Sequence, residues 1–427
     1  MIDQPMPPSV KNYLSANEAT ALLGIRKQTL YAYVSRGWVR SVAQDQRKER
    51  LYLLGDLERL RTRAQVRAGH ESAAASAMNW GEPIIATSIT EICSDGPHYR
   101  GYCAVELAQC EVSFEAVAEL LWNGEMHEPM RPWITTEPSS SMLALIEGFP
   151  KRVAQTQLIE VFALVTLHLA MGRGPTEERV LGGRTFEAAR QVIQTLAGCF
   201  GLLSPASKFV AMRPGESLAA GLIKALGARD HPDNVGLLNS VLVLLADHEL
   251  PPGTMAARMA ASSGSALHSC IAAAIATSSG SQVARLFNRI DAFVGTKPSA
   301  DQLVTRATRL VEDSEEVPGF EHPLYPGGDP RAHCMRALLK KRKSLPAAVE
   351  AICDYVEIMD KTHGLKARYE LMLVALCRAL GLPRHSSSAL FVLSRTAGWV
   401  AHVVEQRTHG HMLRPRAKYI NPISRGF

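Results

Sequence analysis

Histidines and arginines recur in four distinctive phrases of this 427-residue chain: ADHEL (246–250), PGFEHPLYPGGDPRA (318–332), SRTAGWVAH (394–402) and RPRAKY (414–419). Histidine can transfer a proton or donate a hydrogen bond to a carbonyl, and arginine can bind a carboxylate through two parallel hydrogen bonds. A lone histidine is more often a structural residue, so the phrases carry chemistry only if folding brings them together. His322 therefore has three open interpretations: an active-site residue, a member of a carboxylate-binding pocket, or an ordinary loop histidine.

The elements that must position these phrases are predicted to be mostly helices. From about residue 83 the chain is rich in Ala and Leu, with apolar residues at helical spacing and few runs typical of strands. Hydrophobic residues make up 46% of the chain and charged residues 21%, as in ordinary globular proteins. The clearest helical stretches are SFEAVAELLWNGE (113–125), LIEVFALVTLHLAMG (158–172), VGLLNSVLVLLADHE (235–249), AARMAASSGSALHSCIAAAIATSS (256–279) and YELMLVALCRALG (369–381).

Residues 14–65 predict a smaller module of short elements. Ser15 and Glu18 have the spacing of a capping box, and a second helix is expected from about Lys27 to Ser35. SVA (41–43) and LYLL (51–54) read as a small hairpin around a charged loop, and a third helix is expected from Asp56.

This order of elements resembles the winged helix-turn-helix of the MerR and excisionase-like DNA-binding families. LSANEATALLGIRKQTLYAYVSRGWV and RLYLLGDLERL carry the resemblance. It implies contacts to DNA by two groups of side chains. The recognition helix would offer Arg26, Lys27, Gln28 and Thr29 to base edges, and the wing would lay Arg47, Lys48 and Arg50 against phosphates.

The charge distribution supports a local affinity for polyanions. Residues 1–70 hold 12 Lys/Arg against 6 Asp/Glu, whereas the remaining 357 residues hold 35 of each. The whole net charge of +6 therefore lies in the module that resembles a DNA-binding domain. The alternative is a small helical module that docks onto the next domain or onto a dimer mate.

Cysteine spacing and the absence of long apolar runs bear on location and cofactors. The eight cysteines form no CxxC pair and no Cys/His metal spacing, so we expect reduced thiols, a cytoplasmic location and no metal site. The N-terminal MIDQPMPPSVKNYL has no apolar signal core, and the longest apolar run, VLVLLA (241–246), is far shorter than the roughly 20 residues that cross a bilayer. No membrane role is expected.

In their order and spacing, the four phrases resemble those of the citrate synthase family. YRGY, FEAVAELLWNGE and the ending LRPRAKYI strengthen the resemblance, which covers roughly residues 83–427. It implies a mainly α, two-domain helical fold, here preceded by the winged module, and a homodimer that binds oxaloacetate and acyl-CoA without a permanent cofactor. The implied organisation is a winged helix-turn-helix (1–67), a linker (68–82), a large domain (83–283), a small domain (284–375) and the end of the large domain (376–427).

The resemblance also assigns roles to residues of the four phrases. His248 and His322 match the histidines that contact oxaloacetate and polarise its ketone. Arg331, Arg395 and Arg414 match the arginines that bind its carboxylates, the last one from the partner subunit. All five positions are present in this chain.

The positions implied for proton transfer depart from the family pattern. The family's base is the aspartate of an Asn-Val-Asp phrase, which counting back from RALGLP (378–383) places on Arg368, Tyr369 and Glu370. Glu370 keeps a carboxylate, displaced by about one ångström, and such a displacement can cost about 10²-fold in rate. Glu321 stands where the family usually has glycine, and its carboxylate would crowd or repel an incoming acyl-CoA.

The histidine that stabilises the enol in the family has no counterpart. The corresponding stretch SSGSQVARL (278–286) offers Val283 without a gap or Ser279 with one, and no histidine occurs between His268 and His322. Removing such a preorganised donor typically costs about 3–4 kcal/mol. His268 is a poor substitute, because it belongs to the preceding helix.

Two functions are consistent with a chain that keeps the binding positions of the family but departs from it at the proton-transfer positions. The first is a citrate synthase-like acyltransferase that condenses acetyl- or propionyl-CoA with oxaloacetate or a related 2-oxo acid, with weak or altered activity; His248, His322 and Glu370 are its candidate catalytic residues. The second is a catalytically impaired DNA-binding regulator that senses a di- or tricarboxylate. A structural or heterodimeric paralogue is a third, less specific alternative.

Overall fold

The computed structural model describes residues 13–35, 39, 41–43, 50–54, 56–57, 60, 85–127, 132–171, 184–280 and 282–415. The chain divides into two compact units. One combines Met1–Ala86 with Arg414–Phe427, and the other is Thr87–Leu413. The expected boundaries at residues 67, 82, 283 and 375 stay predictions.

The small unit contains two helices and a three-stranded antiparallel sheet of order β1-β3-β2. Its elements are β1 (Tyr13–Leu14), α1 (Ala16–Leu23), α2 (Lys27–Ser35), β2 (Ser41–Ala43) and β3 (Arg50–Leu53). A small apolar core that includes Ala19, Leu30 and Tyr52 holds helices and sheet together.

The predicted details of this unit are confirmed where the structure describes them. The capping box is present, with the Ser15 and Glu18 side chains each bonded to the other's backbone N–H. The hairpin pairs Ser41 with Tyr52. Strand β1 was not predicted, and the helix expected from Asp56 lies largely outside the described residues.

The large unit is mainly helical, as predicted. A three-stranded antiparallel sheet precedes the helices: β4 (Thr90–Cys93), β5 (Gly96–Tyr99) and β6 (Tyr102–Cys103). The helices are α5 (Ala104–Gln109), α6 (Phe114–Asn123), α7 (Ser140–Glu147), α8 (Lys151–Thr156), α9 (Leu158–Met171), α11 (Arg184–Cys199), α12 (Leu218–Ala225), α13 (Pro232–Leu245), α14 (Pro252–Ser262), α15 (Leu267–Ser278), α16 (Ala284–Val294), α17 (Ala300–Glu312), α18 (Pro330–Lys340), α19 (Ala347–His363), α20 (Tyr369–Ala379) and α21 (Ser386–His409).

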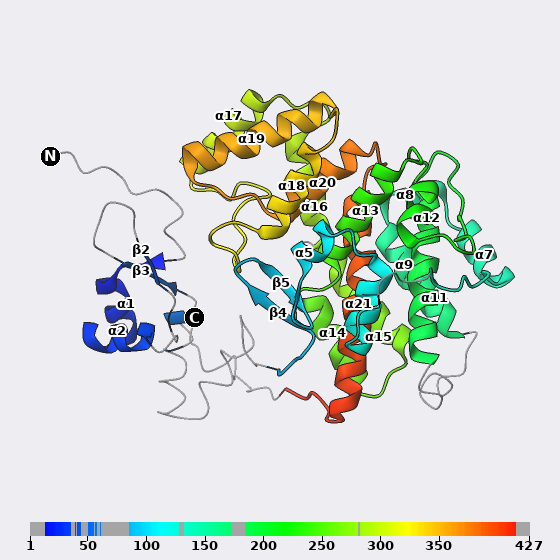
Figure 1. The fold of residues 1–427 in the computed structure, drawn as a ribbon, viewed down its shortest axis with the longest axis horizontal. Helices are drawn as coiled ribbons and strands as arrows, with labels where there is room; N and C mark the ends of the chain where they lie inside the picture. Colours follow the sequence, from blue (N-terminus) through cyan, green and yellow to red (C-terminus); the bar gives the residue numbers. More distant parts are fainter. Residues whose placement is uncertain are drawn as a thin grey trace, which may run out of the picture. The chain divides into compact units, whose positions relative to one another are not determined.

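Helix α21 is the axis of this unit. It runs through the middle of the body beside α14 and α15 and also packs on α6, α9, α11 and α13 (Figure 1). Nearly all of its residues from Ser386 to Gln406 are buried, including Arg395, His402 and Glu405. Charged groups that are buried this deeply require hydrogen-bond or ion-pair partners. The residues that pack around this helix therefore include other polar groups.

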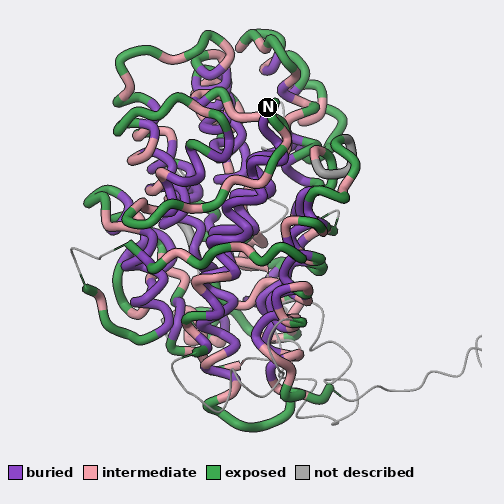
Figure 2. Tube along the Cα trace, turned by 90° about the vertical axis from the view of Figure 1, so that its right-hand side faces the viewer, coloured by how far each residue is buried: buried purple, intermediate pink, exposed green. Residues whose placement is uncertain are grey.

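Helices α16 to α20 gather at one end of the unit, where α17 packs on α19 and α18 packs on α20 (Figure 1). Buried residues concentrate along the inner helices, whereas loops and outer turns are exposed (Figure 2). The stretch 256–279, which was expected to be helical throughout, is two helices, because Gly264 adopts a left-handed conformation between α14 and α15.

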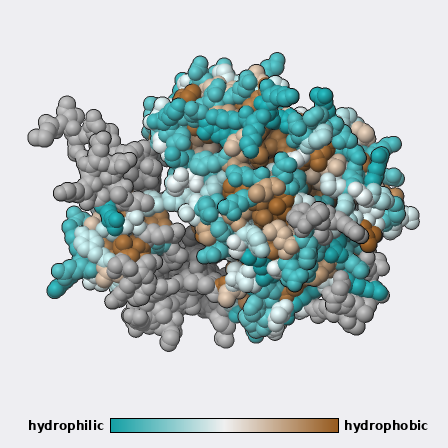
Figure 3. All heavy atoms as spheres, in the orientation of Figure 1, coloured by the Kyte–Doolittle hydropathy of each residue, from teal (hydrophilic) through white to brown (hydrophobic). Residues whose placement is uncertain are grey.

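The surface of the large unit is mostly hydrophilic, with apolar patches (Figure 3). On α9, Leu164 and Leu167 are half exposed and Met171 is 80% exposed, with spacings of three and four residues that place them on one side of the helix. Among the described residues, no helix combines the length and the apolar character needed to cross a membrane.

Candidate active site

Two loops and two helices bring together four of the predicted site residues. His248 follows α13, His322 lies in the loop before α18, Arg331 is in the first turn of α18, and Arg395 is in the middle of α21. The rings of His248 and His322 are 5.5 Å apart, and Arg331 Nη2 lies 3.4 Å from His322 Nε2. Arg395 is close enough to His248 to influence its pKa. The structure therefore gathers both histidines and two of the three arginines into one cluster.

The loop that carries His248 is held by close packing and a buried hydroxyl. The hydroxyl of Tyr99 reaches the carbonyl oxygens at the end of α13 and lies 3.2 Å from the carbonyl oxygen of Asp247. On the other side, the backbone N–H of Gly398 donates to Ala246 O at 3.0 Å. A Cβ at Gly398 would lie 2.1 Å from Asp247 Oδ1, so only glycine permits this approach.

A chain of buried polar groups lies behind this loop. Asp247 bonds to His402 Nε2 at 3.2 Å, and Arg258 Nη1 donates to His402 Nδ1 at 2.9 Å and to Glu405 at 2.6 Å. Glu405 also accepts the backbone N–H of Ser88. Burial alone would raise the pKa of Asp247, but His402 opposes it and the pKa is held below its usual value. The network links α13, α14, α21 and the segment before β4.

His322 is held as a neutral imidazole with a defined tautomer. Burial, reinforced by the charge of Arg331, lowers its pKa to about 3. The backbone N–H of Leu324 donates to His322 Nδ1 at 3.2 Å, so the ring proton belongs on Nε2. Nε2–H and the Arg331 guanidinium are then two donors that face each other, an arrangement that suits an acceptor oxygen placed between them.

His248 is also neutral, and Tyr325 joins the two histidines. Burial, together with Arg331 and Arg395, lowers the pKa of His248 well below its usual value. Its Nε2 lies 3.0 Å from the Tyr325 hydroxyl, and the Tyr325 ring is 5.0 Å from that of His322. Tyr325 was not among the predicted site residues, although it lies in the same phrase as His322.

Arg331 is fully buried and fixed from two sides. Asp329 accepts from its Nε and Nη2, both at 3.0 Å, and the ring of Tyr369 lies 4.1 Å from its guanidinium carbon. Asp329 also caps α18 and accepts the backbone N–H of Tyr369. Burial alone would raise the pKa of Asp329, but Arg331 outweighs it and keeps the carboxyl ionised.

Arg395 is held less completely. Its Nε donates to Leu245 O at 2.9 Å, and its guanidinium carbon lies 4.9 Å from the ring centre of Phe391. Within the described part of the chain, its two terminal nitrogens have no hydrogen-bond partner. Two neutral histidines and a buried arginine with free donors can together bind a carboxylate and polarise a neighbouring carbonyl.

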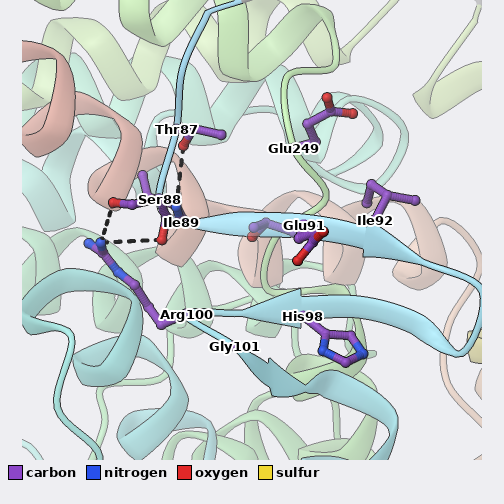
Figure 4. Close-up of a pocket in the computed structure, with 10 residues that line it drawn as sticks. Thr87, Ser88, Ile89, Glu91, Ile92, His98, Arg100, Gly101 and Glu249 are labelled. Carbon is purple, nitrogen blue, oxygen red and sulfur yellow. Dashed lines mark hydrogen bonds between the residues drawn. The ribbon is translucent and has the colours of Figure 1, made fainter. Parts of the chain in front are cut away.

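A cavity of about 490 Å³ lies on the sheet side of this cluster, and His98, Arg100 and Glu249 are among the residues that line it (Figure 4). Glu249 is the neighbour of His248 in sequence. Arg100 donates to the side chain and the backbone oxygen of Ser88 (Figure 4). None of the four clustered residues lines this cavity. It is a separate feature.

Comparison with known proteins decides the family. The family model described as "Citrate synthase, C-terminal domain" matches residues 78–416.

The chain belongs to the citrate synthase family. Citrate synthase 2 of Bacillus subtilis is 26% identical over 81% of this chain and 96% of the relative. 2-Methylcitrate synthase 2 of Corynebacterium glutamicum is 24% identical over 75% of this chain and 88% of the relative.

The solved structures of the family agree in fold. Citrate synthase of Thermotoga maritima matches with a TM-score of 0.67 at 22% identity, over 82% of this chain and 97% of that chain. A Thermoplasma acidophilum citrate synthase in ternary complex with carboxymethyl coenzyme A and oxaloacetate matches with a TM-score of 0.68 at 20% identity, over 81% and 96%. The mainly helical citrate synthase fold is thereby confirmed. The winged module is not part of this comparison, since the family match begins at residue 78.

Against the family pattern, the predicted base is engaged in an ion pair. Glu370 is 4% exposed in the first turn of α20, and Arg368 donates to both of its carboxylate oxygens, at 2.7 and 3.1 Å. Arg368 occupies the position where the family phrase has asparagine. Its charge also contributes to the low pKa of His322. Both carboxylate oxygens of Glu370 therefore accept a charge-assisted hydrogen bond from Arg368.

Glu321 occupies a backbone position suited to glycine. Its φ is 58°, in the left-handed region, and its carboxylate accepts the backbone N–H of Lys366 at 2.9 Å. Burial raises the pKa of this carboxyl. The side chain thus forms part of the contact between the His322 loop and the segment before α20.

The stretch expected to supply an enol-stabilising donor is a turn between helices. Ser279 caps the C-terminal end of α15, and Val283 precedes the first residue of α16. His268 is at the other end of α15, whose 12 residues span about 18 Å. It therefore cannot replace a donor near Ser279 or Val283.

The remaining predicted residues belong to the small unit. Arg414 is exposed and grouped with that unit, so its role in carboxylate binding stays a prediction. For the predicted DNA contacts, Arg26, Lys27, Gln28 and Arg50 are exposed, Thr29 is half-buried, and Arg47 and Lys48 lie outside the described residues.

We predict that the stability of the protein depends on pH through His322. Its pKa is about 3 in the folded protein and near the ordinary value of about 6.5 in the unfolded chain. Between these values the unfolded chain binds a proton that the folded protein does not, so stability is lost as the pH falls below about 6.5. The free energy of unfolding, measured with urea, should therefore fall between pH 7 and pH 5. This fall should be about 1–2 kcal/mol smaller in His322→Gln than in the parent protein.

His127→Gln is the matched control, because the His127 side chain is 68% exposed. This variant should keep the pH dependence of the parent protein. Equal losses in the parent and in His322→Gln would contradict a neutral, buried His322.

Proposed function

We propose that this protein binds oxaloacetate, or a closely related 2-oxo acid, at His248, His322, Arg331 and Arg395 and condenses it slowly with a short acyl-CoA. The convergence of two neutral histidines and two buried arginines carries the proposal. Relatives named citrate synthase and 2-methylcitrate synthase support acetyl- or propionyl-CoA as the partner substrate. The Thermoplasma acidophilum homologue complexed with oxaloacetate and a coenzyme A derivative supports the same pair of substrates.

In this proposal the binding residues have distinct roles. His322 Nε2–H donates to the ketone oxygen and polarises the carbonyl. The free nitrogens of Arg395 bind one carboxylate, and Arg331, already neutralised in part by Asp329, offers its remaining N–H groups to the substrate. His248 is held by Tyr325 and lines the same space.

In this proposal, the residues at the positions for proton transfer account for the slow rate of condensation. Deprotonation of the acyl methyl group requires Glu370 to leave its ion pair with Arg368. No histidine lies between His268 and His322, the stretch where the family resemblance would place the residue that stabilises the enol. Acyl-CoA is a co-substrate, and no permanently bound cofactor is required.

The proposal includes a homodimer, in which each subunit supplies one arginine to the pocket of the other. Arg414, at the edge of the described C-terminal segment, would reach the pocket of the partner subunit, as the family resemblance implies. The exposed apolar side of α9, with Leu164, Leu167 and Met171, is a surface that a second subunit could bury.

Calorimetry with oxaloacetate, paired with a CoA-release assay on acetyl- and propionyl-CoA, tests the proposal. We expect binding of oxaloacetate and slow CoA release. Arg395→Lys should weaken oxaloacetate binding about 10–100-fold, because lysine cannot form the two parallel hydrogen bonds.

Arg309→Lys, which changes an exposed arginine of α17, should leave oxaloacetate affinity unchanged. No binding of oxaloacetate by the parent protein would refute the pocket. Binding without CoA release from either acyl-CoA would refute the enzyme and leave a carboxylate-binding protein.

The double variant Arg368→Asn/Glu370→Asp tests whether the Arg368–Glu370 ion pair limits the rate of condensation. It removes the guanidinium that engages the base and shortens the carboxylate side chain, so CoA release should rise at least about 10-fold. Lys361→Asn, which breaks an exposed ion pair with Glu357 on α19, is the control and should not change the rate. An unchanged rate of CoA release in the double variant, with unchanged oxaloacetate binding, would show that Arg368 does not limit the rate.

The second candidate is a DNA-binding regulator that senses a di- or tricarboxylate without turning it over. The Arg368–Glu370 ion pair favours it, because this pair disables the base while the carboxylate-binding residues remain. The exposed Arg26, Lys27 and Gln28 at the start of α2 are its candidate DNA contacts.

Gel-shift titration against the protein's own promoter region tests this second candidate. If α2 reads bases, Arg26→Ala/Lys27→Ala should weaken binding at least about 10-fold, since base and phosphate contacts are lost together. Asn17→Ala, an exposed change on α1, is the control. Equal binding by the double variant would count against base reading by α2.

A further inference from the structure

The β4–β5 hairpin brings three different metal-ligating side chains together outside the proposed active site. Cys93 Sγ, one carboxylate oxygen of Asp95 and a ring nitrogen of His98 all lie within 4.8 Å of one another. We propose that Cys93, Asp95 and His98 form a binding site for a divalent cation of the zinc class. This site does not depend on the proposed condensation.

Strand register explains why these three side chains converge. Cys93, the last residue of β4, pairs with Gly96, the first residue of β5, around a two-residue turn. Because side chains alternate along a strand, His98 shares a face with the position of Gly96 and is the diagonal neighbour of Cys93. Asp95 lies in the turn, and its Oδ1 is 2.9 Å from His98 Nε2. The C-x-D-x-x-H spacing thus becomes a compact N, O and S donor set, which departs from the expectation, drawn from the cysteine spacing, that the chain has no metal site.

The chemistry of the donors selects the class of ion. A thiolate and an imidazole favour zinc-class cations over calcium or magnesium, which require mainly oxygen ligands. Three protein ligands with water in the fourth position is a common arrangement for accessible zinc. Ligand atoms around tetrahedral zinc lie about 3.3–3.8 Å apart, so small side-chain rotations suffice to close this site.

The surroundings favour a cation and leave it a route of entry. The side chains of His98 and Asp95 are 23% and 59% exposed. Glu91 and Asp95 are charged neighbours of the Cys93 thiol, and both are acidic. Glu91 and His98 also line the open cavity beside the sheet (Figure 4). Binding would release the thiol proton of Cys93 to solvent.

A bound ion would stabilise the hairpin itself, which lies near the helix that carries Arg331. A Cβ at Gly96, the first residue of β5, would lie 3.7 Å from Pro330 Cβ, so this strand begins near the start of α18. Cys93 is also close enough to Tyr325 to influence its pKa. The ion would therefore lie near Tyr325 and the start of α18.

Titration of the full-length protein with Co²⁺ after chelator treatment tests the site. We expect one Co²⁺ per chain, with a sulfur-to-cobalt charge-transfer band in the near ultraviolet and strong visible absorption typical of tetrahedral coordination. Cys93→Ser should abolish the charge-transfer band. His98→Gln and Asp95→Asn should each weaken binding at least about 10-fold.

Cys110→Ser, which removes an exposed cysteine next to α5, is the matched control and should keep the full spectrum. Circular dichroism of each variant verifies that it is folded. A spectrum without a charge-transfer band in the parent protein, or the same band in folded Cys93→Ser, would overturn the proposal.

Discussion

The carboxylate of Asp247 is completely buried at the end of α13, and the interactions that compensate its burial organise the pocket. It bonds to His402, whose other nitrogen is fixed by Arg258, and Arg258 is balanced by Glu405. Each side chain of this network stabilises its neighbour, because a buried charge that loses its partner destabilises a protein by about 3–5 kcal/mol. The network thus fixes α21 against α13 and α14, and it holds the backbone of His248 in place.

Two ion pairs in this protein have opposite consequences for chemistry. Asp329 orients Arg331 but leaves it N–H groups for a ligand, so the pair prepares a binding residue. Arg368 donates to both oxygens of Glu370, so that pair restrains a carboxylate that is predicted to act as the base. A guanidinium has five N–H donors, so Arg331 keeps donors for a ligand, whereas both oxygens of Glu370 are held by a single neighbouring guanidinium. The same fold thus holds one arginine with N–H groups to spare and one carboxylate engaged at both oxygens.

Several features of the fold were predictable from local sequence. The Ser15–Glu18 capping box, α2 and the helices within 113–125 and 158–172 formed where their patterns placed them. The mainly helical body followed from apolar spacing, which reports directly on the face that a helix buries. The break at Gly264 was missed because it depends on a single left-handed residue inside a strongly helical composition. Strand β1 was missed because two residues carry too little pattern to predict pairing.

For the site, the sequence by itself determined which residue types were available: two histidines, three arginines, a glutamate in place of aspartate, and no histidine between His268 and His322. Only the tertiary structure decided how they meet. It placed Tyr325 against both histidines, Arg368 on Glu370, and Cys93 beside Asp95 and His98. The reason is physical. Residue identity sets what a side chain can donate or accept, but which side chains meet depends on helix packing, on strand register and on the path of the backbone between neighbours, none of which follows from residue identity alone.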